Sequence, residues 1–234
     1  MPEVRGKNWD QYWIDSGKSK GLFEIIAKFY RRYIIAPAVQ YYFQRYFQDT
    51  LGRVYLHAGC GSSESDNRIR FTHARFVLMD ISLEGLKIAQ QKSTLPNAWF
   101  VCGDIYHPPF KSDVVDGIWN LGVMEHFYED EITRICQALS RPLRPGGRCL
   151  LFWPPVYGLS VIVLTSFLWI VNKLRRKPLV LYPDEVSRFV SKSWAQKLTQ
   201  PADLEVERAH FGLRDMFTYV ILILAKRSGR NPLP

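Results

Sequence analysis

The chain has 234 residues, of which 47% are hydrophobic and 23% charged, and its 31 basic and 22 acidic residues give a formal net charge of +9. This composition excludes global disorder, and a chain of this length buries a sizeable core without disulfides or a structural metal. The four cysteines form no Cys-x-x-Cys pair, which argues against a zinc or disulfide framework and fits a reducing compartment.

The excess of basic residues suits plain solubility, or else a nucleic acid, an anionic membrane surface or an acidic substrate as partner. Zinc-finger, RNP and basic-zipper patterns are missing from the sequence, so a nucleic acid is not an expected partner. The first residues, MPEVRGKNWDQYW, contain no apolar stretch typical of a secretory signal. We therefore expect a cytoplasmic protein.

Residues 1–50 are rich in aromatic and basic side chains. Apolar residues from Leu22 to Tyr33 recur at helical spacing, and Pro37 should break or kink that pattern. The region is therefore expected to form two helices, roughly over 20–35 and 38–48. We treat 1–50 as an amino-terminal helical lid, although its aromatic stripe is explained more simply by packing against a sheet. That stripe consists of Tyr30, Tyr33, Tyr41, Tyr42, Tyr46 and Phe47.

From residue 51 onward, short apolar runs alternate with helical stretches. Five strands are expected at Val54–Ala58, Phe76–Met79, Trp99–Cys102, Asp116–Asn120 and Arg148–Trp153, with helices over Leu83–Lys92 and Asp130–Ser140 and a turn at Arg144–Gly147. Two later strands, Glu205–His210 and Phe217–Ala225, have a short connection that is typical of an antiparallel pair. This alternation predicts an α/β fold with a mostly parallel sheet covered on both faces. We expect the tail after it to be disordered.

An uncharged stretch interrupts this pattern between Arg148 and Lys173. Residues 156–172 form an apolar stretch whose length is at the lower limit for a transmembrane helix, about 17–25 residues. However, the strands after them must rejoin the sheet that began before them, so both flanks lie on one side. We expect residues 156–182 to form a helical insertion that caps the site, lies in a membrane interface, or does both. A buried core helix or a dimer helix remains the alternative.

Polar residues follow successive strands at the point where each strand ends. His57-Ala58-Gly59-Cys60-Gly61 closes the first strand, and Asp80, Asp104 and Asn120 close the next three. In an open parallel sheet, ligands bind beyond these carboxyl ends. Glycines there let backbone N–H groups approach a ligand, and a carboxylate at position 80 can accept from both hydroxyls of a ribose.

The segments VYLHAGCGSS, FVLMDIS, FVCGDIYHPPF, DGIWNLGVMEHF and LRPGGRCLLF together resemble the successive motifs of class I S-adenosylmethionine-dependent methyltransferases, in particular methyltransferase type 11-like proteins. The resemblance covers residues 51–155 well and 183–225 loosely. It implies a Rossmann-like sheet of seven strands with the last antiparallel, an insertion after strand five, and one methyltransferase domain over 51–234.

By this resemblance, S-adenosylmethionine is the expected cofactor and its site includes residues from four strand ends. His57, Gly59, Cys60 and Gly61 would line its methionine and ribose end, Asp80 would bind the ribose hydroxyls, Ile81 would pack on the adenine, Asp104 with Ile105 would hold the adenine edge, and Asn120 with Leu121 would face the sulfonium. His57 stands where the family usually has an acidic residue, and Ser63 where a third glycine is frequent. These departures leave room for an inactive relative.

Glu125 and His126 are the candidate catalytic residues. His126 suits a general base because imidazole titrates near neutrality, and the alternative is that it only hydrogen-bonds the loop after strand four. Some related O-methyltransferases bind a metal through Glu-x-x-Glu-His. Here Gly122 replaces the first Glu, and a single Glu-His pair is a poor magnesium site, so we expect no metal.

Acceptor specificity in this fold usually lies outside the core, which directs attention to two segments. Trp9, Tyr12 and Trp13 are candidates for a lid over the cofactor cleft, and basic residues flank the apolar insertion in a way that suits an anionic leaflet. These basic residues are Arg31, Arg32, Lys173, Arg175, Arg176 and Lys177.

We therefore predict methyl transfer to a small or lipid-linked hydrophobic acceptor, with attachment to an anionic membrane surface through residues 156–177. An inactive methyltransferase-like partner subunit and an RNA methyltransferase are the alternatives. A nicotinamide-dependent oxidoreductase is disfavoured because the Gly-x-Gly-x-x-Gly fingerprint is missing after Gly61.

Overall fold

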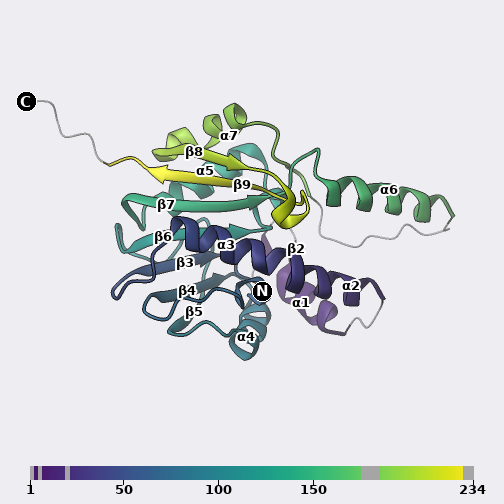
Figure 1. Ribbon diagram of the computed structural model, residues 1–234, viewed down its shortest axis with the longest axis horizontal. Helices are drawn as coiled ribbons and strands as arrows, with labels where there is room; N and C mark the ends of the chain where they lie inside the picture. Colours follow the sequence, from purple (N-terminus) through teal and green to yellow (C-terminus); the bar gives the residue numbers. More distant parts are fainter. Residues whose placement is uncertain (1–2, 5–6, 19–21, 175–184, 229–234) are drawn as a thin grey trace, which may run out of the picture.

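The computed structural model describes residues 3–4, 7–18, 22–174 and 185–228 (Figure 1). Its centre is a seven-stranded sheet of order β5-β4-β3-β6-β7-β9-β8. The strands are β3 (Val54–Ala58), β4 (Arg75–Asp80), β5 (Ala98–Cys102), β6 (Val115–Leu121), β7 (Leu143–Trp153), β8 (Leu204–His210) and β9 (Val220–Lys226). Strand β9 pairs antiparallel with both β7 and β8, whereas β3 to β7 pair in parallel. The predicted Rossmann-like fold with an antiparallel last strand is confirmed.

Helices cover both faces of this sheet because successive side chains of a strand point to opposite sides. The helices are α1 (Trp9–Lys18), α2 (Leu22–Tyr30), α3 (Ala36–Tyr46), α4 (Leu83–Lys92), α5 (Glu129–Ser140), α6 (Leu159–Leu174) and α7 (Lys192–Thr199). Leu56 packs in the core with α5 and α7, whereas its neighbour Tyr55 packs in the core with α3 and α4. A short antiparallel pair, β1 (Glu3–Val4) with β2 (Lys7–Asn8), precedes α1.

Helix α3 accounts for much of the aromatic stripe. Tyr42 and Phe43 are buried, and the Phe43 ring contacts those of Tyr55 and Trp119 on the sheet at centroid distances of 5.4 and 5.0 Å. Edge-to-face packing of this kind adds about 0.5–1.5 kcal/mol per pair beyond the buried area. Over α3 the stripe is therefore core packing.

Pro37 does not separate the two amino-terminal helices as expected. It lies in the first turn of α3, where its missing N–H costs nothing because first-turn donors lack an intrahelical partner. The two helices are instead joined earlier, by a π-helical turn over Arg31–Ile35 that connects α2 to α3. Helix α7 is a further element that the sequence pattern did not predict.

The Arg144–Gly147 turn lies within the bounds of β7 and interrupts its pairing with β6. Val115 of β6 pairs with Leu143, and Gly117 of β6 pairs with Arg148. The turn residues between Leu143 and Arg148 therefore have no strand-pairing partner on β6. Gly146 adopts φ +74° at this point.

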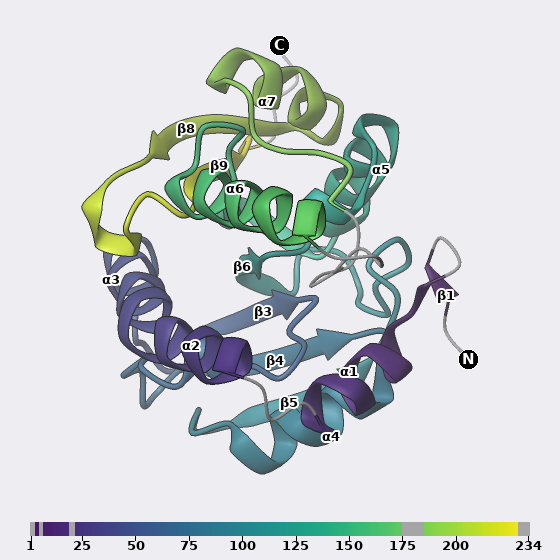
Figure 2. The same cartoon turned by 90° about the vertical axis from the view of Figure 1, so that its right-hand side faces the viewer.

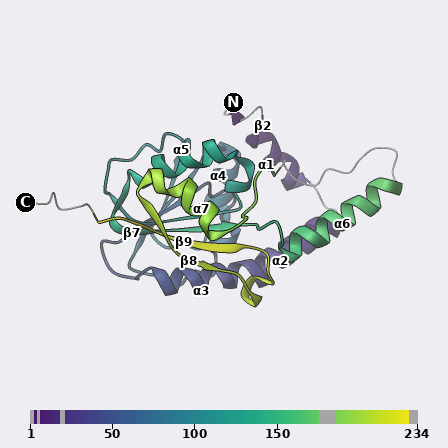
Figure 3. The same cartoon turned by 90° about the horizontal axis from the view of Figure 1, so that it is seen from above.

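Helices α2 and α6 extend away from the sheet in the same direction (Figures 1 and 3). Viewed from that side, α2, α6 and α1 surround the ends of β3 and β4 (Figure 2). Exposed apolar side chains on α2 and α6 include Ile25, Ile26, Phe29, Leu159, Ile162, Val163 and Trp169. Within the described ranges, no helix is long and apolar enough to cross a bilayer.

Candidate active site

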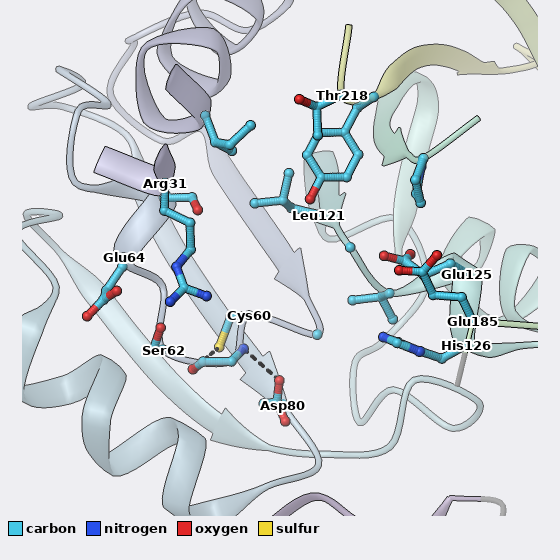
Figure 4. A pocket seen from close by; sticks show the side chains of 18 of the residues that line it. Arg31, Cys60, Ser62, Glu64, Asp80, Leu121, Glu125, His126, Glu185 and Thr218 are labelled. Atoms are coloured by element: carbon cyan, nitrogen blue, oxygen red, sulfur yellow. Dashed lines mark hydrogen bonds between the residues drawn. The ribbon is translucent and has the colours of Figure 1, made fainter. Parts of the chain in front are cut away.

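A cavity of about 810 Å³ lies at the carboxyl ends of β3, β4 and β6 (Figure 4). Such a volume suits a small-molecule site, typically about 300–1,000 Å³. The cavity brings together most of the side chains that the sequence predicted, namely His57, Gly59, Cys60, Gly61, Asp80, Ile81, Asp104, Ile105, Leu121, Glu125 and His126. Among the predicted residues, Asn120 is the exception.

Asn120 lies inside the sheet, without exposed surface, and does not line the cavity. Its Nδ2 donates to the carbonyl oxygen of Ala58 at 2.6 Å, which ties β6 to β3. Because side chains alternate along a strand, the neighbouring Leu121 faces the cavity instead. The expectation that Asn120 faces the cofactor is therefore wrong in this structure.

Two glycines with positive φ shape the turn after β3, and a hydrogen bond joins this turn to Asp80. Gly59 and Gly61 adopt φ +77° and +50°, a region that L side chains rarely enter. A Cβ at Gly59 would lie 2.7 Å from Val123 Cγ2. The Gly61 N–H donates to Asp80 Oδ2 at 2.7 Å, so the carboxylate of β4 fixes the turn of β3.

Asp80 also accepts from the Ser82 N–H through Oδ1 at 2.8 Å. Each carboxylate oxygen accepts about two hydrogen bonds, so both oxygens keep capacity for a ligand hydroxyl. Burial raises the pKa of Asp80. On the next strand, Asp104 accepts from the Tyr106 N–H at 2.9 Å and faces the same cavity. The two carboxylates thus share one site.

His57 is the buried member of a polar network behind the glycine turn. Its Nδ1 lies 2.7 Å from Asp66 Oδ2, and its ring stacks on Trp119 with centroids 4.6 Å apart. Asp66 also accepts from Ser63 Oγ and Trp119 Nε1. His57 Nε2 is buried without a hydrogen-bond partner among the described residues. An acidic side chain therefore stands behind His57, although the sequence position that is usually acidic holds histidine.

Helix α1 covers the other side of the turn. A Cβ at Gly61 would lie 2.4 Å from the Trp13 ring, and one at Gly85 would lie 2.8 Å from it. Asp10 accepts from Ser82 Oγ at 2.6 Å and from the Glu84 N–H at 3.1 Å, and the bond from Ser82 lowers its pKa. Trp9, Tyr12 and Trp13 all line the cavity, as a lid would.

Glu125 and His126 lie on the opposite side of the cavity from Arg31 and Glu64 (Figure 4). The Trp9 ring contacts the ring of His126 at 5.2 Å. Glu125 is 5% exposed and its Oε2 is buried without a hydrogen-bond partner among the described residues. Burial raises the pKa of Glu125 to about 8.

Several residues in or behind the cavity had no signal in the sequence that placed them there. Asp66, which contacts His57 behind the cavity, lies nine positions after it, a spacing that matches no ligand pattern. Arg31, whose Nε is buried without a partner among the described residues, and Tyr219 line the cavity from distant segments. Within the described ranges, no group of three or more His, Cys, Asp or Glu side chains lies together in a way that could hold a metal ion.

Glu125→Gln should make the protein more stable than the wild type at pH 8 and equally stable near pH 5. Between its ordinary pKa of 4.5 and about 8, the folded wild type keeps a proton that the unfolded chain has lost. Wild-type stability therefore falls as pH rises through this window, by at most about 5 kcal/mol. The variant lacks this penalty, and urea unfolding of both proteins from pH 5 to 8.5 measures it.

Glu205→Gln, on a carboxylate whose side chain is 61% exposed, serves as the control and should show no such trend. A stability difference between Glu125→Gln and the wild type that is constant with pH would contradict the buried, protonated carboxyl.

Comparisons with known proteins agree with this geometry. Residues 56–151 match a family model described as a methyltransferase domain. Over 101 residues the chain is 30% identical to the Mycobacterium ulcerans (strain Agy99) protein named "Probable phthiotriol/phenolphthiotriol dimycocerosates methyltransferase 2". This match covers 42% of the chain and spans only 38% of that relative's length.

Two solved structures share the fold across nearly the whole chain. Magnesium protoporphyrin IX methyltransferase from Synechocystis PCC 6803 with bound SAH superposes with a TM-score of 0.65 at 16% identity, covering 93% of this chain and 96% of that one. A chain from the complex between the Haloferax volcanii Trm112 methyltransferase activator and a methyltransferase gives 0.67 at 15%, covering 95% and 97%.

The family match over β3 to β7 and the strand order of the sheet lead to one assignment. Residues 56–151 contain a methyltransferase domain, and the sheet built around them has the Rossmann-like order of class I S-adenosylmethionine-dependent methyltransferases.

Proposed function

We propose that the protein transfers the methyl group of S-adenosylmethionine to a small or lipid-linked hydrophobic acceptor at a membrane surface. The observation that carries the proposal is one continuous cavity with two different ends. One end contains the glycine turn, Asp80 and Asp104, and the other lies against apolar residues of α2 and α6. A methyl donor and an apolar acceptor can therefore occupy the same cavity.

The donor end contains the residues that would bind a nucleoside with an amino-acid tail. Asp80 would bind the ribose hydroxyls, and Ile81, Asp104 and Ile105 would contact the adenine. Gly59 and Gly61 let the Val123 and Trp13 side chains pack closely against the turn, and both glycines line the cavity where the sulfonium and its tail would lie. The unpartnered Nε2 of His57 would meet a polar group of that tail, which fits the donor even though the usual acidic residue is missing.

When bound, S-adenosylmethionine supplies an electrophilic methyl group, so the protein contributes mainly position. Holding a nucleophile in line with that methyl can supply about 7–11 kcal/mol of the barrier. His126 lines the cavity near the end of β6 and stays a candidate general base. Its contact with Trp9 also suits the alternative role of joining the lid to the loop.

The acceptor end is predominantly apolar. Ile26 and Ala27 of α2 and Leu159, Val161 and Val163 of α6 line it. Two of them, Ile26 and Val163, are also 56% and 59% exposed, so apolar surface continues from the cavity to the outside. The similarity to a protein named as a methyltransferase of dimycocerosates gives limited support to a lipid-linked acceptor.

Attachment to a membrane follows from the outer surfaces of the same two helices. Exposed apolar side chains on α2 and α6 lie beside exposed Lys28, Arg32 and Lys173. Each basic residue near an anionic leaflet contributes about 1 kcal/mol, and the apolar side chains enter the interface. Arg175, Arg176 and Lys177, which were expected to contribute, lie outside the described residues.

Asp80→Ala should weaken binding of S-adenosylmethionine about a hundredfold or more. Two charge-assisted hydrogen bonds to the ribose are lost, each contributing about 1.5–3 kcal/mol. Isothermal titration calorimetry measures the affinity, thermal unfolding checks the fold, and Asp130→Ala on the exposed face of α5 is the control. Unchanged affinity in Asp80→Ala would refute the donor site, and a wild type that does not bind would favour an inactive partner subunit.

Flotation with vesicles tests the membrane proposal. The wild type should float with vesicles containing anionic lipid at physiological salt, because apolar and basic side chains lie together on α2 and α6. Ile162→Glu with Val163→Glu, at side chains that are 52% and 59% exposed, should reduce the floated fraction severalfold or more.

The matched control for flotation is Leu51→Glu, at a side chain that is 82% exposed in the segment preceding β3. This variant should float like the wild type. A wild type that stays at the bottom of the gradient, or equal flotation of all three proteins, would refute membrane attachment through α2 and α6.

A further inference from the structure

The carboxyl group of Glu125 is buried in the cavity wall with part of its hydrogen-bonding capacity unused. Its main-chain oxygen accepts hydrogen bonds from the Val186 and Ser187 N–H groups at 2.7 and 3.1 Å. These two bonds fix the main chain of Glu125 against that segment. The side-chain atom Oε2, by contrast, is buried and has no hydrogen-bond partner among the described residues. Figure 4 shows the side chain among the cavity residues, beside Glu185 and His126.

A buried polar atom without a partner is costly, and a protein retains one where a ligand completes it. Gly122 (φ +67°) lies next to this carboxyl, since a Cβ there would be at ordinary contact distance, 3.4 Å, from Glu125 Oε1. Val123, Phe127 and Pro154 line the same cavity, together with the polar side chains of Glu185 and His126. The missing partner is therefore expected from the acceptor.

Three kinds of acceptor group could meet such a carboxyl: a metal-bound group, an ammonium or a hydroxyl. No metal-binding group of three side chains forms in the part of the chain that the structure describes. An ammonium is disfavoured because burial raises the pKa of the Glu125 carboxyl to about 8, so below that pH the carboxyl is neutral and offers no charge to a cation. A hydroxyl is neutral, and it both donates to a carboxylate and accepts from a carboxylic acid.

We propose that Glu125 receives a hydroxyl group of the acceptor and takes its proton during methyl transfer, so that the protein is an O-methyltransferase for apolar, hydroxyl-bearing molecules. This inference rests on the proposed function. The oxygen–carbon bond to the methyl forms as the carbon–sulfur bond of the donor breaks. The hydroxyl proton moves to the Glu125 carboxylate, and the sulfonium becomes a neutral thioether, so charge and atoms balance.

The environment of Glu125 makes it a stronger base than an ordinary carboxylate. Burial raises its pKa to about 8, with a smaller contribution from Glu185 and an opposing one from Arg188. The other titratable groups near it are Tyr219, whose own pKa is raised by burial and then by Glu125, and His126. Because the base is the ionised form, the transfer rate should rise with pH up to about 8 and then level off.

The first experiment measures binding of three probes with the same apolar tail: 4-octylphenol, its methyl ether 4-octylanisole, and 4-octylaniline. Calorimetry is done with the full chain saturated with S-adenosylhomocysteine. The wild type should bind the phenol about tenfold or more tightly than the ether. Glu125→Leu should lose this preference, and Glu125→Gln should keep part of it because an amide also hydrogen-bonds. Glu205→Gln, at an exposed carboxylate of β8 outside the cavity, is the control and should keep the preference in full.

The second experiment measures methylation of 4-octylphenol by mass spectrometry as a function of pH. Glu125→Gln should reduce the rate about a hundredfold or more and remove its rise towards pH 8. Infrared titration of the same proteins should show a protonated carboxyl band that is present in the wild type below pH 8 and missing in Glu125→Gln.

The outcomes separate this inference from the proposed function. If the wild type binds S-adenosylmethionine but binds phenol and ether equally, prefers the aniline, binds none of the probes, or loses no preference in Glu125→Leu, the role of Glu125 is refuted and methyl transfer stands. If it does not bind S-adenosylmethionine at all, the proposed function itself fails.

Discussion

The hydrogen bond from the Gly61 N–H to Asp80 is the interaction on which the rest of the site depends. It joins the turn after β3 to the end of β4 and fixes the glycine backbone at the edge of the sheet. Parallel strands direct their carboxyl ends to one edge, so this single contact sets where a ligand can lie. Asp104, Ile105 and the residues after β6 then complete the wall around the same point.

Rigid packing keeps this edge in place from below. Phe43 of α3 packs on Tyr55, and His57 stacks on Trp119, so the aromatic residues under the turn also order the polar network of His57 and Asp66. His57 stands at the position where the resemblance leads one to expect an acidic residue, and the folded chain brings the carboxylate of Asp66 next to it.

Much of the fold was predictable from the sequence because hydrophobic alternation and turn residues are local signals. The strands β3 to β7 and the gathering of Asp80 and Asp104 followed from them. Other features depended on tertiary context. Asn120 has the same position in the pattern as a site residue, yet it binds Ala58 inside the sheet. Pro37 lies in the first turn of a helix and does not break one. Arg31 and Tyr219 reach the cavity from segments without a motif, and Asp66 contacts His57 behind it.

We propose that the two ends of the cavity divide the chemistry between a donor site at the glycine turn and an apolar acceptor site between α2 and α6. A crystal structure of the protein with S-adenosylhomocysteine tests this division most directly. We expect both ribose hydroxyls within hydrogen-bond distance of the Asp80 carboxylate, about 2.6–3.2 Å, with the sulfur facing Glu125. A nucleoside bound elsewhere, or a ribose turned away from Asp80, would contradict it.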